Sequence, residues 1–583
     1  MQLATLDWMI VLVVLLLTLG IGALVSKRAS RSSDSYFLAG RHMPWWLLGL
    51  SMVATTFSAD TPNLVADIVR TQGVAGNWVW WSLLISGMLT AFVYAKLWRR
   101  LGVTTDVEFY EHRYSGKTAG FLRGFRALYL GLFFNVMIMA NVTLAAVKIG
   151  TVLFGVSPQM VILVAGLVTV VFCSIGGFLG VLITDMMLFI LAMAGAILAA
   201  YFAVTHPQVG GLDNLLSHAN VVGKTSIIPD LTNPDVYVPL LAIPLLVQWW
   251  SVWYPGSEPG GGGYVAQRML AAKNEHHSVA AAAFFNLCHF ALRPWPWILV
   301  ALASLVVYPD LASLQQALPQ VPDAMVRDDL AYSAMLVFLP TGVLGLVVAS
   351  LVSAYVSTIS TSLNWGASYF VNDFYGRFLR PDASERRKVW VGRCVTLVLM
   401  VLAAGFAMML ESSLQAFRLQ LTIGAGTGLL FLLRWFWLRI NVYSEITAMV
   451  LSFVVSVFFE FGPYSELLGW QKMVFSVAIT TLGWVSVTLL TPAETPETLA
   501  SFKQRIQGAP KEVSLGLLAA VASTLGIYAV LMGIGACLYG EFLQAAGCLF
   551  VALITGVLTW CLYHKCWPGG SRIDKELPSV SAS

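Results

Sequence analysis

The most regular feature of the sequence is a series of long apolar runs separated by short polar segments. A helix needs roughly 20 apolar residues to cross the hydrocarbon core of a bilayer. By this criterion we predict about fifteen transmembrane helices, with cores at Asp7–Val25, Trp45–Val69, Trp78–Leu97, Leu128–Val152, Met160–Ile175, Gly180–Val204, Val238–Tyr254, Ala280–Val307, Leu330–Val371, Val389–Leu410, Ala416–Phe436, Val442–Phe459, Met473–Leu490, Leu515–Leu538 and Leu543–Tyr563. The run Leu330–Val371 is longer than one crossing requires, so we expect a single helix that is tilted or extends into water.

The basic residues are distributed unequally between the two sets of loops that these helices create. If the N-terminus lies outside, the inner loops hold most Lys and Arg, including those in 27–41, 96–126 and 377–393. Because cytoplasmic loops are enriched in Lys and Arg, we predict an extracytoplasmic N-terminus and a cytoplasmic C-terminus. The first run is followed by basic residues and shows no small-residue cleavage site, which indicates a signal anchor.

The composition excludes several classes of protein. Apolar residues make up 58% of the chain and charged residues 11%, whereas soluble domains carry about 25% charged residues. The net charge of +4 gives no support for a nucleic-acid partner. The seven cysteines are scattered, which favours small buried side chains over a metal site or disulfides. The composition and the apolar runs predict an all-α, polytopic membrane protein. Because no HExxH or GxSxG motif is present, we predict that it is not an enzyme.

Two of the predicted spans contain residues that interrupt a helix at membrane depth. The second span includes the polar insert Ala54–Pro62, and the seventh ends in the Pro- and Gly-rich run Tyr254–Gly263. Pro lacks a backbone donor, and Gly costs about 1 kcal/mol per helical position. Irregular backbone at this depth survives only where it is buried in protein or lines a cavity. A functional site and a simple kink between packed helices both remain possible from this pattern.

The two interrupted helices begin two successive five-helix sets, Trp45–Val204 and Val238–Phe436. Broken helices at matching positions of two halves are typical of inverted-repeat transporters and mark the binding site. We therefore predict a five-plus-five inverted-repeat core and these units: 1–42, an extra helix and cytoplasmic loop; 43–204, the first repeat; 205–236, an extracytoplasmic loop; 237–437, the second repeat; 438–563, C-terminal extra helices; and 564–583, a cytoplasmic tail.

The ninth span contains an unusual number of hydroxyl side chains. At helical spacing, residues at i, i+3, i+4 and i+7 share one face, here Ala354, Ser357, Thr358 and Thr361, with Ser360 on its flank. Neutral oxygens from this face, with carbonyls from the interrupted Ala54–Phe57 turn, make a shell suited to Na⁺. Hydrogen bonding between helices explains such a stripe equally well. A glycine-rich segment, Gly424–Gly428, lies inside a span and indicates close helix packing rather than a nucleotide loop.

Several short motifs follow one another between Ser35 and Trp437. They are Tyr36–Arg41, Pro44–Trp46, Gly49–Ser51, Tyr264–Arg268, Ala271–Lys273, and Ser357-Thr358 with Asn364. Together they resemble the sodium/solute symporter family, which includes sodium/glucose and sialic acid symporters. The resemblance implies a ten-helix core of two inverted repeats, surrounded by extra helices, that couples solute import to Na⁺.

The resemblance also implies the ion ligands. A sodium site between the first and eighth core helices carries over to the carbonyls of Ala54, Phe57 and Ala354 and the hydroxyls of Ser357 and Thr358. Members that couple a second Na⁺ are similar to this chain at Asp185, Ser360 and Thr361, so we expect one or two Na⁺ per cycle. A carboxylate such as Asp185 is costly inside a membrane unless it is paired or faces an ion.

The solute is expected at the bilayer midplane, against the broken helices. We predict that its site includes Thr56, Asp60, Thr61, Ser82, Ser251, Tyr254, Arg293 and Gln420. Tyr254 resembles the aromatic residue that gates sugar carriers from inside, and Arg293 falls where sugar carriers have a lysine. The planar guanidinium suits a carboxylate or paired hydroxyls, with an ion pair to Asp60 or another acid as the alternative. The glutamate of sugar carriers is replaced by an aromatic-rich stretch, Val79–Ser82.

The function predicted from these features is Na⁺-coupled secondary active import of a small polar solute, most favourably a sugar or sugar derivative. We expect a multi-pass protein of the cell (plasma or inner) membrane in which a monomer suffices for transport. The alternatives are Na⁺-coupled import of a carboxylate or an amino acid, and a transporter-like membrane sensor.

Overall fold

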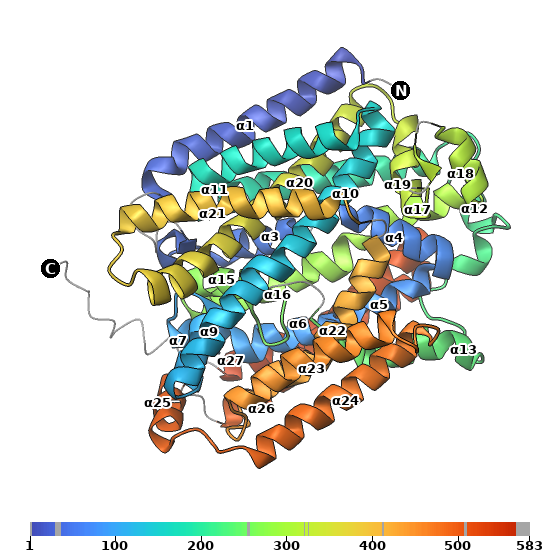
Figure 1. The fold of residues 1–583 in the computed structure, drawn as a ribbon. Coiled ribbons are helices and arrows are strands. Elements are labelled where there is room, and N and C mark those ends of the chain that lie inside the picture. The colour runs from blue at the N-terminus through green and yellow to red at the C-terminus, as the bar shows by residue number, and fades with distance from the viewer. Residues whose placement is uncertain are drawn as a thin grey trace.

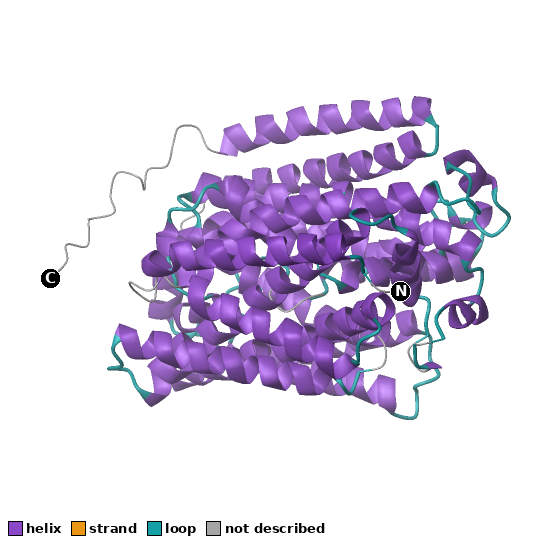
Figure 2. Ribbon diagram, turned by 90° about the horizontal axis from the view of Figure 1, so that it is seen from above, coloured by secondary structure: helices purple, strands orange, loops and turns teal. Residues whose placement is uncertain are grey.

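The computed structural model describes residues 3–29, 37–56, 58–252, 257–319, 321–323, 326–410, 413–506 and 510–566. Within these ranges the chain consists of helices and their connections, with no β-strand (Figures 1 and 2). Ten helical stretches there are long and apolar enough to span a membrane, and five shorter apolar helices accompany them. Their positions agree with the predicted apolar runs. The predicted all-helical membrane fold is therefore confirmed, while the number of crossings stays a prediction.

The label α marks an α-helix, and the label η marks a 3₁₀- or π-helical turn. Up to Val204 the elements are α1 (Thr5–Ala29), η1 (Ala39–Arg41), α3 (Trp45–Thr56), α4 (Asp60–Gln72), η2 (Val74–Asn77), α5 (Trp78–Trp81), α6 (Leu84–Leu89), η3 (Thr90–Tyr94), α7 (Ala95–Leu101), η4 (Asp106–Glu108), α8 (Phe109–Arg113), α9 (Gly116–Leu128), η5 (Tyr129–Phe134), α10 (Asn135–Phe154) and α11 (Pro158–Val204). The middle of the chain forms α12 (Leu212–Ser217), η6 (Val222–Lys224), α13 (Pro234–Tyr237), η7 (Val238–Ala242), α14 (Ile243–Leu246), η8 (Gln248–Trp250), α15 (Gly263–Ala271), α16 (Glu275–Leu287), η9 (Cys288–Leu292), α17 (Pro294–Val307), α18 (Leu311–Ala317), α19 (Leu330–Met335), η11 (Leu336–Phe338), α20 (Val343–Ser368) and η12 (Tyr369–Leu379). The remainder forms α21 (Glu385–Ala407), α22 (Ser413–Leu433), α23 (Val442–Phe461), α24 (Gly469–Leu490), α25 (Pro496–Ile506), α26 (Pro510–Leu538) and α27 (Phe542–Cys566).

One predicted span is divided in the structure. The run Leu330–Val371 was expected to be a single long helix, but α19 and η11 end before Leu339 and α20 starts anew after Gly342. Leu339 is extended, as expected for a residue before proline, and Pro340 has no backbone donor. Gly342 then takes a φ of 87°. The prediction of one continuous helix was therefore wrong, because local backbone chemistry breaks an uninterrupted apolar run.

The N-terminus of α20 is capped by the carboxylate of Asp7 from α1. Asp7 Oδ1 accepts hydrogen bonds from the backbone N–H groups of Gly342 at 2.7 Å and Gly345 at 2.8 Å. Free N–H groups at a helix start carry partial positive charge, so a buried carboxylate is stabilising there. This contact fixes the extra N-terminal helix to the helix that carries the hydroxyl stripe.

The fifth and sixth predicted spans both lie within α11, which is helical over 47 residues. The Cys173 thiol donates to the Ser360 carbonyl at 3.4 Å, and Asp185 accepts from the Ser357 hydroxyl at 2.6 Å. A straight helix advances about 18 Å between residues 173 and 185, yet their partners lie only one turn apart on α20. The chain therefore changes direction within α11, and two separate stretches of it pass α20.

Both predicted helix breaks are present. Helix α3 ends at Thr56 and α4 begins at Asp60, and Phe57 lies outside the described residues. The second break is wider, since α14 ends at Leu246 and α15 begins at Gly263, with only the short turn η8 between them in the described part. The prediction that these two segments cannot stay helical is thus confirmed.

Glycine fixes the path of the chain into α15. Gly260 and Gly261 have φ values of 84° and 92°, which side chains rarely allow. A Cβ atom at Gly261 would lie 2.5 Å from the side chain of Met269 and 2.8 Å from Trp98 Nε1. Trp98 Nε1 donates to the Gly260 carbonyl at 2.7 Å. The turn is therefore held in close contact with α7, where only glycine fits.

The first part of this break lies directly against α22. A Cβ atom at Gly424 would be 2.2 Å from the Val252 carbonyl oxygen, and one at Gly428 would be 1.8 Å from the Trp250 carbonyl oxygen. Trp250 Nε1 also donates to the Ala425 carbonyl at 3.1 Å. These contacts confirm the interpretation of the glycine-rich segment as a packing motif.

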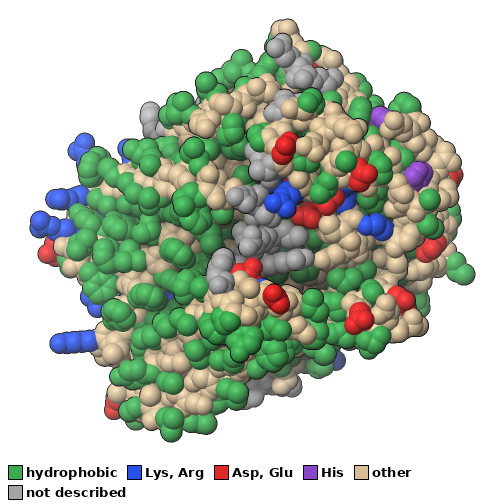
Figure 3. Space-filling model, turned by 45° about the vertical axis from the view of Figure 1, so that its right-hand side comes forward, with side chains coloured by type: hydrophobic (Ala, Val, Ile, Leu, Met, Phe, Trp, Pro, Cys, Tyr) green, Lys and Arg blue, Asp and Glu red, His purple; other side chains and the backbone are tan. Residues whose placement is uncertain are grey.

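The outer surface is largely apolar. Helix α27 lies at the periphery beside α26 (Figure 2), and its Leu543 is 91% exposed. In Figure 3 hydrophobic side chains cover a broad band, Lys and Arg gather at the left edge, and most visible Asp, Glu and His side chains lie in the right half. An apolar surface of this extent requires lipid around it. The predicted orientation requires basic side chains to gather at one end of the molecule, as they do in this view. The orientation itself stays a prediction.

We expect Gly428→Ala to destabilise the protein. The added methyl group overlaps the Trp250 carbonyl, and overpacking typically costs about 1–3 kcal/mol. Thermal unfolding of the purified protein in detergent measures the effect. Gly556→Ala in α27 is the matched control, because a Cβ there meets nothing within 4 Å. Equal melting temperatures for the two variants would contradict the packing role.

Candidate functional site

The centre of the candidate site is the contact between the broken end of α3 and the hydroxyl stripe of α20. The Thr358 hydroxyl donates to the Thr55 carbonyl at 2.7 Å. Thr55 is in the last turn of α3, where carbonyls lack partners within the helix and carry partial negative charge. The break therefore presents backbone oxygens to the hydroxyl-bearing face of α20, an arrangement whose chemistry suits a small cation.

The predicted ligands of the first Na⁺ are brought to this contact as far as the structure describes them. Ala54 and Thr358 flank the Thr55 contact, and Ala354 and Ser357 lie within one helical turn of Thr358. All four predicted residues that are described are buried. The fifth, Phe57, lies outside the described residues. The donor set of hydroxyls and carbonyls fits a hard monovalent cation.

Asp185 adds a negative charge beside this contact. Its Oδ1 accepts from the Ser357 hydroxyl at 2.6 Å, and its Oδ2 accepts from the Ser51 hydroxyl. Asp185 is fully buried, and an uncompensated buried carboxylate is costly. The predicted first and second ion sites are therefore adjacent, with Ser357 between them.

Arg268 from α15 compensates the negative charge of Asp185. The Arg268 Nη2 lies 3.6 Å from Asp185 Oδ2 and donates to Thr55 Oγ1 at 3.1 Å and Thr361 Oγ1 at 3.0 Å. Its Nε and Nη2 also donate to Ser51 Oγ at 3.1 and 3.0 Å. Arg268 is fully buried. We call Ser51, Thr55, Asp185, Ser357 and Thr361 the hydroxyl cage.

The role of Arg268 was missed in the sequence, where it was only part of a motif. A charged residue between apolar neighbours, directly after a helix break, was the available signal. Of the three residues predicted for a second Na⁺, Asp185 and Thr361 meet through Arg268. The third, Ser360, donates instead to the Ser357 carbonyl of its own helix at 3.1 Å.

Other motif residues also meet through α15. Gln267 Nε2 donates to the Phe37 carbonyl at 2.9 Å and to Asn364 Oδ1 at 3.2 Å. Close by, the Met43 N–H donates to the Ala271 carbonyl at 3.1 Å, forming part of a short parallel bridge. The motifs are therefore one spatial unit that clamps α15 between the start of α3 and α20.

On the other side of the first break, Asp60 begins α4. Asn141 Nδ2 from α10 donates to Asp60 Oδ2 at 3.2 Å, and Asp60 interacts electrostatically with Arg293. Arg293 is buried, lies 5.2 Å from the Trp297 ring and approaches His289 Nε2 at 3.5 Å. A half-buried acid and amide and a buried guanidinium thus lie close to the first break.

Two residues that are predicted to bind the solute form hydrogen bonds with backbone carbonyls at the end of α3. The Thr56 hydroxyl donates to the Met52 and Val53 carbonyls at 3.0 and 2.9 Å, and the Thr61 hydroxyl donates to the Thr56 carbonyl at 3.4 Å. These bonds supply partners for carbonyls of the last turns of α3. Both side chains therefore shape the break.

Three other predicted residues present buried polar atoms. The hydroxyls of Ser82 and Ser251 and the Nε2 of Gln420 have no hydrogen-bond partner among the described residues. A buried polar group without a partner costs about 1–3 kcal/mol, so such atoms mark places for water or a polar ligand. The eighth predicted residue, Tyr254, lies outside the described residues.

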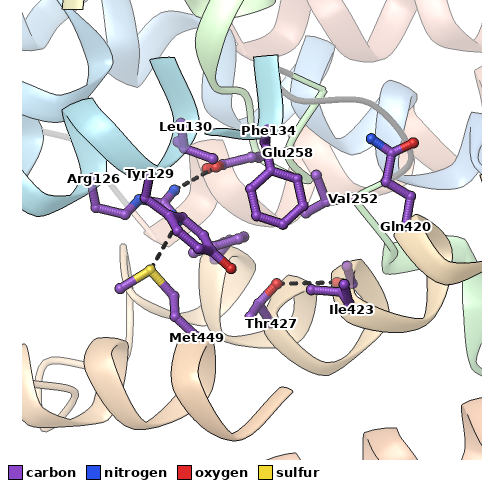
Figure 4. Close-up of a pocket in the computed structure, with 12 residues that line it drawn as sticks. Arg126, Tyr129, Leu130, Phe134, Val252, Glu258, Gln420, Ile423, Thr427 and Met449 are labelled. Atoms are coloured by element: carbon purple, nitrogen blue, oxygen red, sulfur yellow. Dashed lines mark hydrogen bonds and ion pairs between the residues drawn. The ribbon is translucent and has the colours of Figure 1, made fainter. Parts of the chain in front are cut away.

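A cavity of about 40 Å³ lies beside the second break (Figure 4). Gln420 from α22 lies on one side of it and Arg126 from α9 on the other, with Val252 from the first part of the break between them. Arg126 Nη2 lies 2.5 Å from Glu258 Oε1, and Arg434 Nη2 lies 3.7 Å from Glu258 Oε2. Arg126 and Glu258 line the cavity, and both are buried.

The sequence did not indicate this ion cluster. In the sequence, Glu258 lies within the Pro- and Gly-rich run, and Arg126 lies in a segment predicted to be a cytoplasmic loop. In the structure Arg126, Glu258 and Arg434 are all buried. The available signal was an acidic residue inside an interrupted membrane segment, which requires a basic partner.

Comparison with known proteins agrees with this architecture. A model of the sodium:solute symporter family matches residues 36–452. The chain is 29% identical over 479 residues to a sodium/glucose cotransporter of Vibrio parahaemolyticus, a match that covers 79% of this chain and 86% of the relative. It is 23% identical over 492 residues to the sodium/sialic acid symporter SiaT of Proteus mirabilis (strain HI4320), covering 81% and 93% of the two chains.

A solved structure shares the fold. A substrate-bound, outward-open Na⁺-coupled sialic acid symporter superposes with a TM-score of 0.67 at 23% identity, covering 84% of this chain and 99% of the other. The family match extends over most of the sequence and includes both broken helices, the hydroxyl stripe and α15. This chain belongs to the sodium:solute symporter family.

Proposed function

We propose that this Na⁺-coupled symporter imports a small hydroxylated solute, a sugar or sugar derivative. The observation that carries the ion half of the proposal is the bond from the Thr358 hydroxyl to the Thr55 carbonyl. It sets the hydroxyl stripe of α20 against the broken end of α3. Relatives named for glucose and for sialic acid transport support the solute class.

In this proposal Na⁺ binds to the carbonyls of Ala54, Phe57 and Ala354 and the hydroxyls of Ser357 and Thr358. Uncharged oxygens bind the ion weakly enough for it to leave at the end of the cycle. The ion therefore links α3 to α20, because both segments supply some of its ligands. If the solute prefers the same arrangement of these helices, each ligand raises the affinity for the other by the same factor.

The solute binds between the two breaks. The polar atoms of Ser82, Ser251 and Gln420, which have no partner in the described part of the chain, offer donors and acceptors to a hydroxylated molecule. The neighbouring ring of Trp81 is buried and offers an apolar face for a sugar ring. Tyr254 is the proposed aromatic gate at the second break.

A carboxylate-bearing sugar is a second candidate. The observation that favours it is the buried guanidinium of Arg293 next to the first break. Arginine binds carboxylates through two parallel hydrogen bonds.

We also propose that residues 43–204 and 237–437 form two inverted repeats, since each contains one break near its start. The N-terminus is proposed to be extracytoplasmic.

We expect Ser357→Ala and Thr358→Ala to weaken Na⁺ binding about tenfold or more, because a tenfold loss corresponds to about 1.4 kcal/mol, the size of one ligand contact. The measurement is Na⁺-dependent thermal stabilisation of the purified protein, with choline replacing Na⁺. Ser350→Ala is the control, since the Ser350 hydroxyl bonds to the Val347 carbonyl of its own helix. Unchanged Na⁺ dependence in both site variants would refute the assignment.

A panel of solutes tests the substrate class. Glucose, N-acetylneuraminate, gluconate, proline and lactate are added to the purified protein in NaCl and in KCl, and the melting temperature is recorded. We expect at least one sugar or sugar acid to stabilise the protein in NaCl only, because coupled ligands raise each other's affinity. Stabilisation by proline or lactate alone would overturn the proposed solute class.

Arg293→Gln and Arg293→Lys separate a neutral sugar from a sugar acid. For an acidic solute we expect Arg293→Gln to abolish Na⁺-dependent uptake and Arg293→Lys to retain part of it, because the ammonium keeps the charge. For a neutral sugar the two variants should weaken uptake to a similar degree. Radiolabelled uptake into proteoliposomes measures both, and wild-type uptake by both variants would remove Arg293 from the site.

A further inference from the structure

The Arg268 guanidinium is bound on all three of its nitrogen atoms. Beyond its contacts with the hydroxyl cage, Nη1 donates to the Tyr264 carbonyl and to Gln267 Oε1, both at 3.4 Å. The rings of Phe178 and Tyr264 flank the guanidinium, with centroids 5.1 and 5.6 Å from Cζ. Aromatic faces attract cations and hold a planar guanidinium in place. The position of the charge is therefore closely defined.

The guanidinium contacts the oxygens that a second Na⁺ would need. Nη2 donates to Thr361 Oγ1 at 3.0 Å and lies 3.6 Å from Asp185 Oδ2. Ser51 Oγ links the two charges, because it donates to Asp185 and accepts from Arg268. A metal ion bound to these atoms would lie next to a fixed positive charge.

Charge balance also disfavours a second Na⁺ in the hydroxyl cage. Asp185 and Arg268 are fully buried, and together they are neutral. Adding Na⁺ would leave two positive charges around one carboxylate in a site shielded from water, where like charges repel strongly. The carboxylate is already compensated, so it offers little to a further cation.

We propose that Arg268 is a built-in cation that occupies the second ion position of the hydroxyl cage, so that the chain binds one Na⁺ and couples one Na⁺ to each solute. This inference rests on the proposed Na⁺ site at Ser357 and Thr358. Asp185 then acts as a positioning residue, which holds Ser357 on one side and Arg268 on the other. The side chain at position 268 determines the ion stoichiometry.

Counting bound ions tests the proposal without knowledge of the solute. Radioactive Na⁺ is bound at equilibrium to the purified full chain in detergent, and the number of ions per chain is determined at saturation. We expect one for the wild type and two for Arg268→Gln, which removes the charge but retains a polar side chain. Arg268→Lys keeps the charge and is expected to bind one.

A double variant identifies the second ion's ligand. Adding Asp185→Asn to Arg268→Gln removes the carboxylate and should return the count to one. Wild-type protein that binds two Na⁺ would overturn the inference and leave the proposed symport intact, whereas wild-type protein that binds none would contradict the proposed function itself. If Arg268→Gln does not fold, as judged by size-exclusion chromatography, the wild-type count still decides between one ion and two.

Discussion

The structure depends on how the backbone oxygens at the break in α3 find partners. No water is available in a bilayer core, so every carbonyl released by a broken helix must be satisfied by protein, ion or ligand. Thr358 and Thr61 supply hydroxyls to two of these carbonyls. The helix break and the hydroxyl stripe, which lie about 300 residues apart in the sequence, are therefore two halves of one site.

The second break contributes to the same site because it positions α15. Glycine at positions 260 and 261 brings the chain close to α7 and lets α15 enter between α3 and α20. Its Gln267 and Arg268 then hold both neighbours by hydrogen bonds. Buried ion pairs such as Arg268 with Asp185 contribute little net stability after desolvation. We therefore relate their presence at the meeting point of four helices to the proposed control of ion binding rather than to stability.

The sequence was informative where local chemistry decides the structure. Apolar runs located the helices, Pro and Gly located both breaks, and helical spacing placed Ser357 and Thr358 on one face. It was uninformative where partners come from distant segments. The division at Pro340 was hidden by apolar residues on both sides, and the partners of Arg268 and Glu258 lie on other helices. Such pairings are set by tertiary packing, which leaves no periodic signal along the chain.

The two ends of the first break differ in charge, and this difference bears on the solute. The C-terminal end of α3 is partly negative and suits a cation, whereas the N-terminal end of α4 is partly positive. In this chain Asp60 already stands in the first turn of α4 and compensates that positive end. In the proposed function, Asp60 would repel an anionic group of the solute there, and a carboxylate would need the Arg293 guanidinium to compensate its charge. The hydroxyls of a sugar would suit both residues in that proposal, because each hydroxyl can donate to Asp60 or accept from Arg293.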